Sequence, residues 1–345
     1  MNRPVHVAGF AQLPHVLRDA THDEAEQVQI VTAAALANAG IARSDVGFTC
    51  SGSNDYVMGR PFSFVSALDG LGAWPPIRES HVEMDGAWAL YEAWVRLQHG
   101  DVDVALVYAF GKSSLGRVDA VCTMMLDPYF LAPLGIGPLA MAALQARVLL
   151  DARVCTERDF AEVVARARRN GIANGQVPAA PRDDVDSLLA LPWVASPLRA
   201  HDAAVRTDGA AAIVLTVGGA GPRISGLAHR IDSHHPGSRD LLTCRSATLA
   251  AQAAGLADAP IDAAELHVPY SNQELVLSRA LDLPPHVCVN PSGGSLVAET
   301  PMVAGLVRIG EAANLIRHGG ARRTLAHATS GPCLQHNLVC LLEAS

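Results

Sequence analysis

The chain has 345 residues, of which 50% are hydrophobic and 17% are charged, so it can bury a sizeable core and is not a disordered chain. Its formal net charge is -8, and no dense basic block is present, which argues against a nucleic-acid-binding protein. The length predicts one large domain or two similar ones.

The chain shows no sign of secretion or membrane insertion. Its first residues lack a signal-peptide pattern. The longest apolar stretch, residues 128–146, contains Pro133, Gly135, Gly137 and Pro138, which break a spanning helix. The seven cysteines are scattered, with no CxxC pair and no zinc-ligand spacing. We therefore predict no membrane span and a cytoplasmic location.

The first hundred residues alternate between strand and helix patterns. Residues 5–12 form an apolar run typical of a buried strand, and residues 24–39 show helical spacing that ends at Gly40. A strand is predicted next at 45–50, then a helix at 85–97. A nearly continuous apolar strand follows at 103–110, as expected of a strand covered on both faces.

The pattern loosens between residues 111 and 206, which we interpret as a lid inserted into an α/β core. Pro/Gly-rich stretches there surround two helical runs, 138–150 and 158–171. Beyond the insertion the sequence predicts strands at 210–217, 223–229, around 266, at 324–328 and at 338–342, with helices at 243–254, 272–281 and 302–318.

Alternating strands and helices predict an α/β fold with a largely covered central sheet. A helix, Gln98-His99-Gly100 and a strand are followed later by a helix, Arg317-His318-Gly319 and a strand. This weak repeat suggests two similar halves. We place them at residues 1–220, including the lid region at about 111–206, and at residues 221–345.

A tight polar turn, Pro291-Ser292-Gly293-Gly294-Ser295, follows an apolar segment. One interpretation is a strand-to-helix connection. The other is a backbone that approaches a substrate closely, for which glycine is suited. The sequence has no Gly-rich phosphate loop of the P-loop or dinucleotide type.

Five segments in order resemble thiolases of the sterol-carrier and lipid-transfer type. Residues 197–199 (PLR) and 208–212 (DGAAA) match two motifs at about the family's spacing. Residues 265–275 (ELHVPYSNQEL) resemble its "ElHDCFS-nEl" element, 289–294 (VNPSGG) its "vNpsGG" turn, and 333–337 (CLQHN) its C-terminal loop. The resemblance implies the thiolase fold, with two duplicated βα halves in five layers and a shortened lid.

The departures from the family concern its reactive groups. Glu83 stands where the family has its nucleophilic cysteine, Pro269 replaces the cysteine of the "HDCF" element, and Thr300 replaces the histidine of the "GHP" element. Thiolysis needs a thiolate to form an acyl-enzyme and a histidine to activate it. We therefore expect no cysteine acyl-enzyme at this position.

His267 and Tyr270 are the candidates for carrying chemistry, because the resemblance places His267 in an oxyanion hole and Tyr270 at a phenylalanine position. His267 can alternatively be a structural histidine, and Tyr270 a core ring. Glu83 and Asp85 are candidate bases at the start of the helix predicted at 85–97. A carboxylate there can instead only stabilise the helix N-terminus.

The remaining candidates are weaker. Cys333 lies near the loop that bears a second reactive cysteine in some thiolases, but a small buried hydrophobe is the alternative. We expect Gly293, Gly294, Thr300 and Gly331 to bind substrate. His234 and His235 are adjacent but have no third ligand in the sequence, so we predict no metal site.

The resemblance implies an acyl-CoA substrate with a steroid or lipid side chain, and no cofactor beyond that coenzyme A. We expect C–C bond cleavage by a retro-aldol or thiolase-type reaction. The alternative is a non-catalytic subunit that stabilises a catalytic partner. The resemblance also implies a homodimer, or a hetero-oligomer with an OB-fold, zinc-ribbon protein or a second thiolase-like chain.

Overall fold

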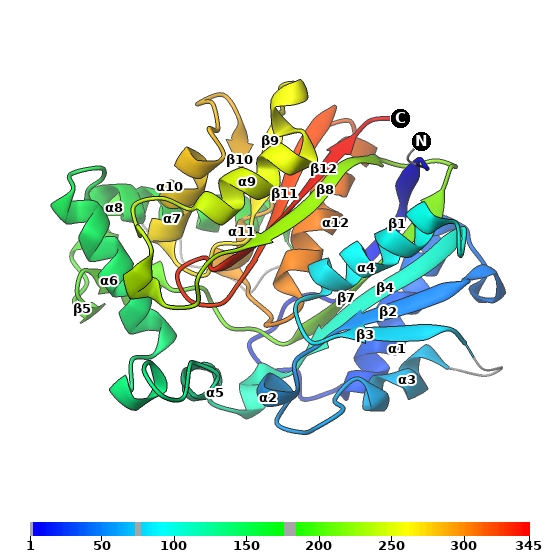
Figure 1. The fold of residues 1–345 in the computed structure, drawn as a ribbon, viewed down its shortest axis with the longest axis horizontal. Helices are drawn as coiled ribbons and strands as arrows, with labels where there is room; N and C mark the ends of the chain where they lie inside the picture. Colours follow the sequence, from blue (N-terminus) through cyan, green and yellow to red (C-terminus); the bar gives the residue numbers. More distant parts are fainter. Residues whose placement is uncertain (1–2, 73–76, 176–183) are drawn as a thin grey trace.

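The structure, a computed structural model, describes residues 3–72, 77–175 and 184–345 (Figure 1). Two groups of five strands form its main sheet. The first half contributes β1 (Val5–Gln12), β2 (Phe48–Gly52), β3 (Glu79–Val82), β4 (Val104–Gly111) and β7 (Gly209–Val217). The second contributes β8 (Arg223–Ile231), β9 (Ala263–Leu266), β10 (Cys288–Val289), β11 (Arg323–Ser330) and β12 (His336–Glu343).

The two groups have the same internal order. Strands β3, β2 and β4 are parallel. β7 pairs antiparallel with β4, and β1 pairs antiparallel with β7, so β1 runs in the same direction as the first three. In the second half β10, β9 and β11 are parallel, β12 pairs antiparallel with β11, and β8 pairs antiparallel with β12. In the sheet, β1 and β8 join the two groups through the residue pair His6 and Arg223. This repeated topology confirms the predicted α/β fold with duplicated halves.

Three layers of helices separate and cover the strands (Figure 1). Helices α4 (Gly86–His99) and α12 (Ala304–Arg317) contribute to a buried cluster that also takes side chains from the strands of both halves. Helices α1 (Glu24–Ala39) and α3 (Val65–Leu71) cover the outer face of the first half. Helices α9 (Arg245–Ala254) and α10 (Ser271–Ala280) cover the second.

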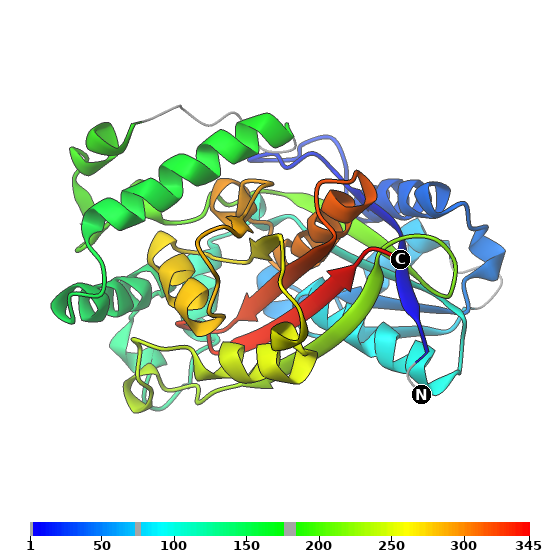
Figure 2. The same cartoon turned by 90° about the horizontal axis from the view of Figure 1, so that it is seen from above.

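The region predicted as a lid folds mainly into helices. They are α5 (Val118–Met124), α6 (Pro138–Asp151), α7 (Glu157–Asn174) and α8 (Val185–Leu189), followed by the short hairpin of β5 (Trp193–Ala195) and β6 (Leu198–Arg199). Helix α7 lies along the second half, where it contacts α10 and α11 (Gly294–Val297) (Figure 2). An insertion in the first half therefore covers part of the second.

Most predicted elements lie within a few residues of the observed ones. Short elements were not predicted from the sequence, namely β3, β10, the β5–β6 hairpin, α3, α5, α8, α11 and the four-residue helix α2 (Asp55–Met58). Within the described part of the chain, no helix has both the length and the hydropathy needed to cross a membrane.

The packing of α4 against its neighbours fixes the residue before it. Gly86 is the first residue of α4, and a Cβ there would come within 2.7 Å of the Ala109 Cβ on β4. Gly52 at the end of β2 packs equally closely against the start of α4, because a Cβ added there would lie 2.5 Å from the Gly86 nitrogen. The N-terminus of α4 is thus held tightly against the sheet, and Asp85 with it.

Candidate active site

A cavity of about 400 Å³ lies where the two halves and the lid region meet. Much of its wall is apolar, with contributions from Met84, Met125, Leu126, Met141, Met302 and Leu334. Polar side chains gather in two places, around the start of α4 and between β9 and α10. The sequence-predicted residues that line it are Glu83, Asp85, His267, Tyr270, Gly331 and Cys333.

His267 and Tyr270 are placed by the same short connection. His267 directly follows β9, and Tyr270 immediately precedes α10 as its N-terminal flanking residue. The backbone between them is tied to another segment, since the Ala204 N–H donates to the Pro269 carbonyl at 2.8 Å. Both side chains are buried, with exposed fractions of 6% and 7%.

His267 belongs to a buried charged network that was not predicted from the sequence. Its Nε2 lies 3.3 Å from Glu299 Oε1, and Glu299 Oε2 lies 3.0 Å from Arg206 Nη1. The Thr329 N–H points at Nδ1 at 3.4 Å. Since an amide can only donate, Nδ1 is an acceptor, and the ring proton of the neutral imidazole lies on Nε2, toward Glu299.

The Glu299 carboxylate is ionised in this network. Burial alone would raise its pKa, but the Arg206 guanidinium and the hydrogen bond from His267 together hold that pKa below its ordinary value. The 3.3 Å contact to His267 is long for a hydrogen bond. The imidazole N–H can therefore exchange this partner for an oxygen in the cavity at little cost.

Backbone pairing brings Arg206 and Glu299 together, although they are far apart in sequence. The Thr207 N–H donates to the Glu299 carbonyl at 3.0 Å, and the Glu299 N–H donates to the Val205 carbonyl at 2.8 Å. Two features of the sequence could have pointed to Glu299 and Arg206 as site residues. Glu299 takes the glycine position of the "GHP" element, and Arg206 directly precedes the segment Thr207-Asp208-Gly209.

Tyr270 presents a neutral phenol to this network. Burial raises its pKa well above the ordinary value, and Arg206 opposes that shift without cancelling it. The phenol is therefore protonated at neutral pH, and it can donate a proton or relay one, but it is not a ready base.

Asp85, at the start of α4, is fully engaged by backbone groups. Its carboxylate accepts from the Ala87 N–H at 2.8 Å, the Gly305 N–H at 2.9 Å and the Leu306 N–H at 3.1 Å. Burial raises its pKa, while His267 and the three amides oppose that rise. One side chain thus caps α4 and also binds the first turn of α12, which is the helix-terminus role named as the alternative.

Glu83 lies at the rim of the cavity rather than inside it. Its side chain is 45% exposed, and one oxygen lies 3.0 Å from His81 Nε2 while the other accepts the Asp55 N–H. His81 Nδ1 lies 3.2 Å from the Ser51 hydroxyl. Glu83 therefore connects the end of β3 to the first residue of α2, and it occupies the position where the resemblance would place a cysteine.

Cys333 lines the cavity but is buried and protonated. Burial raises the pKa of its thiol to about 11, with Arg239 opposing the shift. The thiol donates weakly to the Met141 carbonyl at 3.6 Å. Its backbone has a φ of 50°, in the left-handed region, and Arg239 holds this loop through the Pro332 and Cys333 carbonyls. This geometry fits a structural residue.

Three predicted substrate-binding residues do not line the cavity. A Cβ on Gly293 would lie 2.6 Å from the Gly171 Cα, so this glycine permits close packing of α11 on α7. Gly294 adopts a φ of 67° beside Asn290. Thr300 is fully buried and bonds the Thr207 hydroxyl at 2.9 Å and His15 at 3.2 Å. Gly293 and Gly294 lie in the connection between β10 and α11, and substrate binding by these three residues stays a prediction.

Comparison with known proteins identifies the fold. No family model matches the chain. One curated relative, the 17-hydroxy-3-oxo-4-pregnene-20-carboxyl-CoA lyase of Mycobacterium tuberculosis, is 29% identical over 202 residues, which cover 53% of this chain and 50% of the relative. The matched segment thus spans about half the length of that relative.

Solved structures match the whole chain. An Ltp2-ChsH2(DUF35) aldolase superposes with a TM-score of 0.83 at 20% identity and covers 99% of this chain and 98% of its own. Human mitochondrial 3-ketoacyl-CoA thiolase in complex with CoA gives 0.79 at 15% identity, with the same two coverages. The chain has the thiolase fold, and the resemblance predicted from its sequence is confirmed.

Proposed function

We propose that this chain cleaves a C–C bond in an acyl-CoA thioester by a retro-aldol reaction, without a cysteine acyl-enzyme. The observation that carries the proposal is the polar end of the cavity. There Tyr270, His267, Glu299 and Arg206 gather against an apolar wall. The position expected of a nucleophile holds Glu83 instead.

A β-hydroxyacyl thioester fits the chemistry of these groups. The Tyr270 phenol relays the β-hydroxyl proton to the ionised Glu299 carboxylate, and the Cα–Cβ bond breaks to leave a ketone. The electron pair forms a thioester enolate, whose oxygen accepts the His267 Nε2–H. Return of the proton to Cα completes a shorter acyl-CoA, so atoms and charge balance and no cofactor beyond coenzyme A is required.

The apolar wall suggests a bulky acyl group. Methionine side chains contribute much of it and adapt to irregular apolar shapes. The partial sequence match to a lyase that acts on a pregnene carboxyl-CoA supports a steroid or lipid side chain.

We further propose that the chain works as a dimer or in a hetero-oligomer. β3 ends the main sheet, so one of its edges has no strand partner among the described residues. One of the similar structures is an Ltp2-ChsH2(DUF35) aldolase, whose name gives two proteins, and this supports a two-protein assembly here. Sedimentation of the purified chain, alone and with candidate partners, should give a species larger than 36.2 kDa. A stable monomer in every mixture would contradict this proposal.

The reaction is tested by incubating the chain, alone and with its co-purifying partner, with a β-hydroxyacyl-CoA that carries a branched apolar side chain. We expect stoichiometric ketone and shortened acyl-CoA by mass spectrometry. If turnover appears only with the partner and survives loss of both Tyr270 and His267, the chain is a structural subunit and the active site belongs to the partner.

A further inference from the structure

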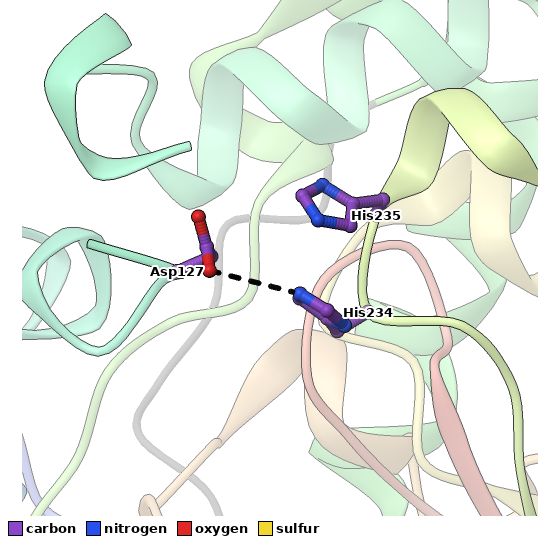
Figure 3. A group of neighbouring side chains, drawn as sticks. All are labelled: Asp127, His234 and His235. Atoms are coloured by element: carbon purple, nitrogen blue, oxygen red, sulfur yellow. Dashed lines mark ion pairs between the residues drawn. The ribbon is translucent and has the colours of Figure 1, made fainter. Parts of the chain in front are cut away.

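Outside the cavity, Asp127, His234 and His235 form a compact group of metal-binding side chains (Figure 3). Each offers one ligand atom, and these three atoms all lie within 4.8 Å of one another. Asp127 follows α5, whereas the two histidines lie between β8 and the 3-10 turn Pro236–Ser238. The third ligand that the sequence lacked beside the histidine pair is thus supplied by a distant segment.

The orientation of these side chains favours a shared ligand. The two imidazole rings lie 4.1 Å apart between centroids, although neighbours in an extended chain normally point to opposite sides. His234 Nε2 is 4.0 Å from Asp127 Oδ2 (Figure 3). The other carboxylate oxygen, Oδ1, accepts the Tyr129 and Phe130 N–H groups at 3.1 and 2.6 Å. Asp127 therefore keeps Oδ2 directed toward the histidines, as backbone partners do for metal ligands elsewhere.

We propose that Asp127, His234 and His235 bind a zinc ion that fastens the lid region beside the cavity. Two imidazoles and a carboxylate are a ligand set for zinc rather than for calcium or magnesium, which prefer oxygen. Ligand atoms of a tetrahedral zinc ion lie about 3.3 to 3.5 Å apart, given its bond lengths. Small rotations close the remaining gap, and the His234 side chain is 54% exposed and free to make them.

Zinc binding at this site would affect the wall of the cavity. Met125 and Leu126, which line the cavity, directly precede Asp127. On the other side the Asp232 N–H donates at 2.9 Å to the carbonyl of Gln335, another lining residue. A metal bridge would therefore join the lid segment to the loop after β8, which is hydrogen-bonded to the β11–β12 connection, and would limit opening of the cavity at this edge. This inference does not depend on the proposed reaction.

Zinc binding can be measured on the full chain after removal of metals with a chelator. The chain should carry Cys288→Ser, because Cys288 is exposed and thiols are themselves zinc ligands. We expect one equivalent of Zn²⁺ by calorimetry. Co²⁺ in its place should give the intense visible absorption of a four-coordinate site. Asp127→Asn, which keeps the acceptor for the two amides, and His234→Ala should each weaken binding at least tenfold, the effect expected for loss of a zinc ligand or its charge.

The matched control is His286→Ala, which removes an exposed histidine far from the cluster in sequence and should leave zinc affinity unchanged. Hydrogen exchange of residues 118–135 should slow with zinc in the parent chain and not in His234→Ala. Absence of stoichiometric binding, or equal binding by parent and both ligand variants, would overturn the site. Specific binding without protection of residues 118–135 would overturn its fastening role.

Discussion

The two polar ends of the cavity have different roles. At the start of α4, the Asp85 carboxylate accepts hydrogen bonds from three backbone N–H groups of two helices. At the start of α10, Tyr270 has a side chain that faces the cavity, and His267 is held by two long contacts, to Glu299 and to the Thr329 N–H. The two ends come from different halves of a duplicated fold. One end has become structural and the other is available for chemistry.

This difference between the α4 and α10 ends explains how the cavity can keep reactive groups although no cysteine stands at the nucleophile position. The α4 terminus still has to meet α12, and a buried carboxylate satisfies amides that would otherwise lack partners. At the other end Glu299 pairs with both His267 and Arg206, and Arg206 is the last residue of the lid region. The lid region therefore leads directly into the site.

Removing either proton-handling group should have the largest effect on turnover. Tyr270→Phe and His267→Ala should each slow C–C cleavage by roughly 10²-fold or more, the scale of one acid–base or oxyanion group. The measurement is the rate of ketone release by the assembled protein. Both variants should still fold and assemble, and Tyr270→Phe should keep its unfolding midpoint, since Phe fills the same space. Wild-type rates in both would place the chemistry in the partner.

At the α4 end the main effect should be on stability. Asp85→Ala removes a cap and leaves buried amides of α4 and α12 unpaired, which should cost about 3 kcal/mol of unfolding free energy. Glu83→Ala is the matched control, because this half-exposed carboxylate should cost less than about 1 kcal/mol. Urea unfolding at pH 7 measures both. Equal losses from the two variants would show that Asp85 does not join the helices.

Much of the fold follows from sequence, because long periodic segments have strong patterns. Helix 24–39 was predicted to the residue, with an acidic first turn and Gly40 as stop. Short elements such as β3 and β10 have two to four residues and too little pattern to be recognised. At the site, His267 and Tyr270 could be proposed from a motif, whereas the Glu299–Arg206 pair depends on strand-like backbone pairing across 93 residues, which no local pattern reveals.

Acid should selectively weaken the network at the α10 end. The pKa of Glu299 is lower in the folded chain than its ordinary value of 4.5, so the ionised carboxylate stabilises the fold above that pH. This stabilisation is lost as pH falls through the lower, folded pKa. The stability difference between wild type and Glu299→Gln should therefore be constant from pH 7 to about 5.5 and shrink below 4.5. Unfolding midpoints across this range test it, and a difference that persists to pH 3 would contradict it.

Substitution of Cys333, which also lines the cavity, is expected to have the smallest effect on turnover. With a thiol pKa of about 11, roughly one molecule in 10³ to 10⁴ carries the thiolate at pH 7.5, so the sulfur is a poor nucleophile. Cys333→Ser keeps a donor for the Met141 carbonyl and should turn over within about twofold of wild type. Rapid quench with acyl-CoA, followed by peptide mass analysis, should find no acyl group on any cysteine. An adduct on Cys333 that disappears in Cys333→Ser, together with lost turnover, would mean that the nucleophile has moved from the α4 terminus to the β11–β12 loop. The division between a structural end and a reactive end would then be wrong, because the reactive atom would belong to neither.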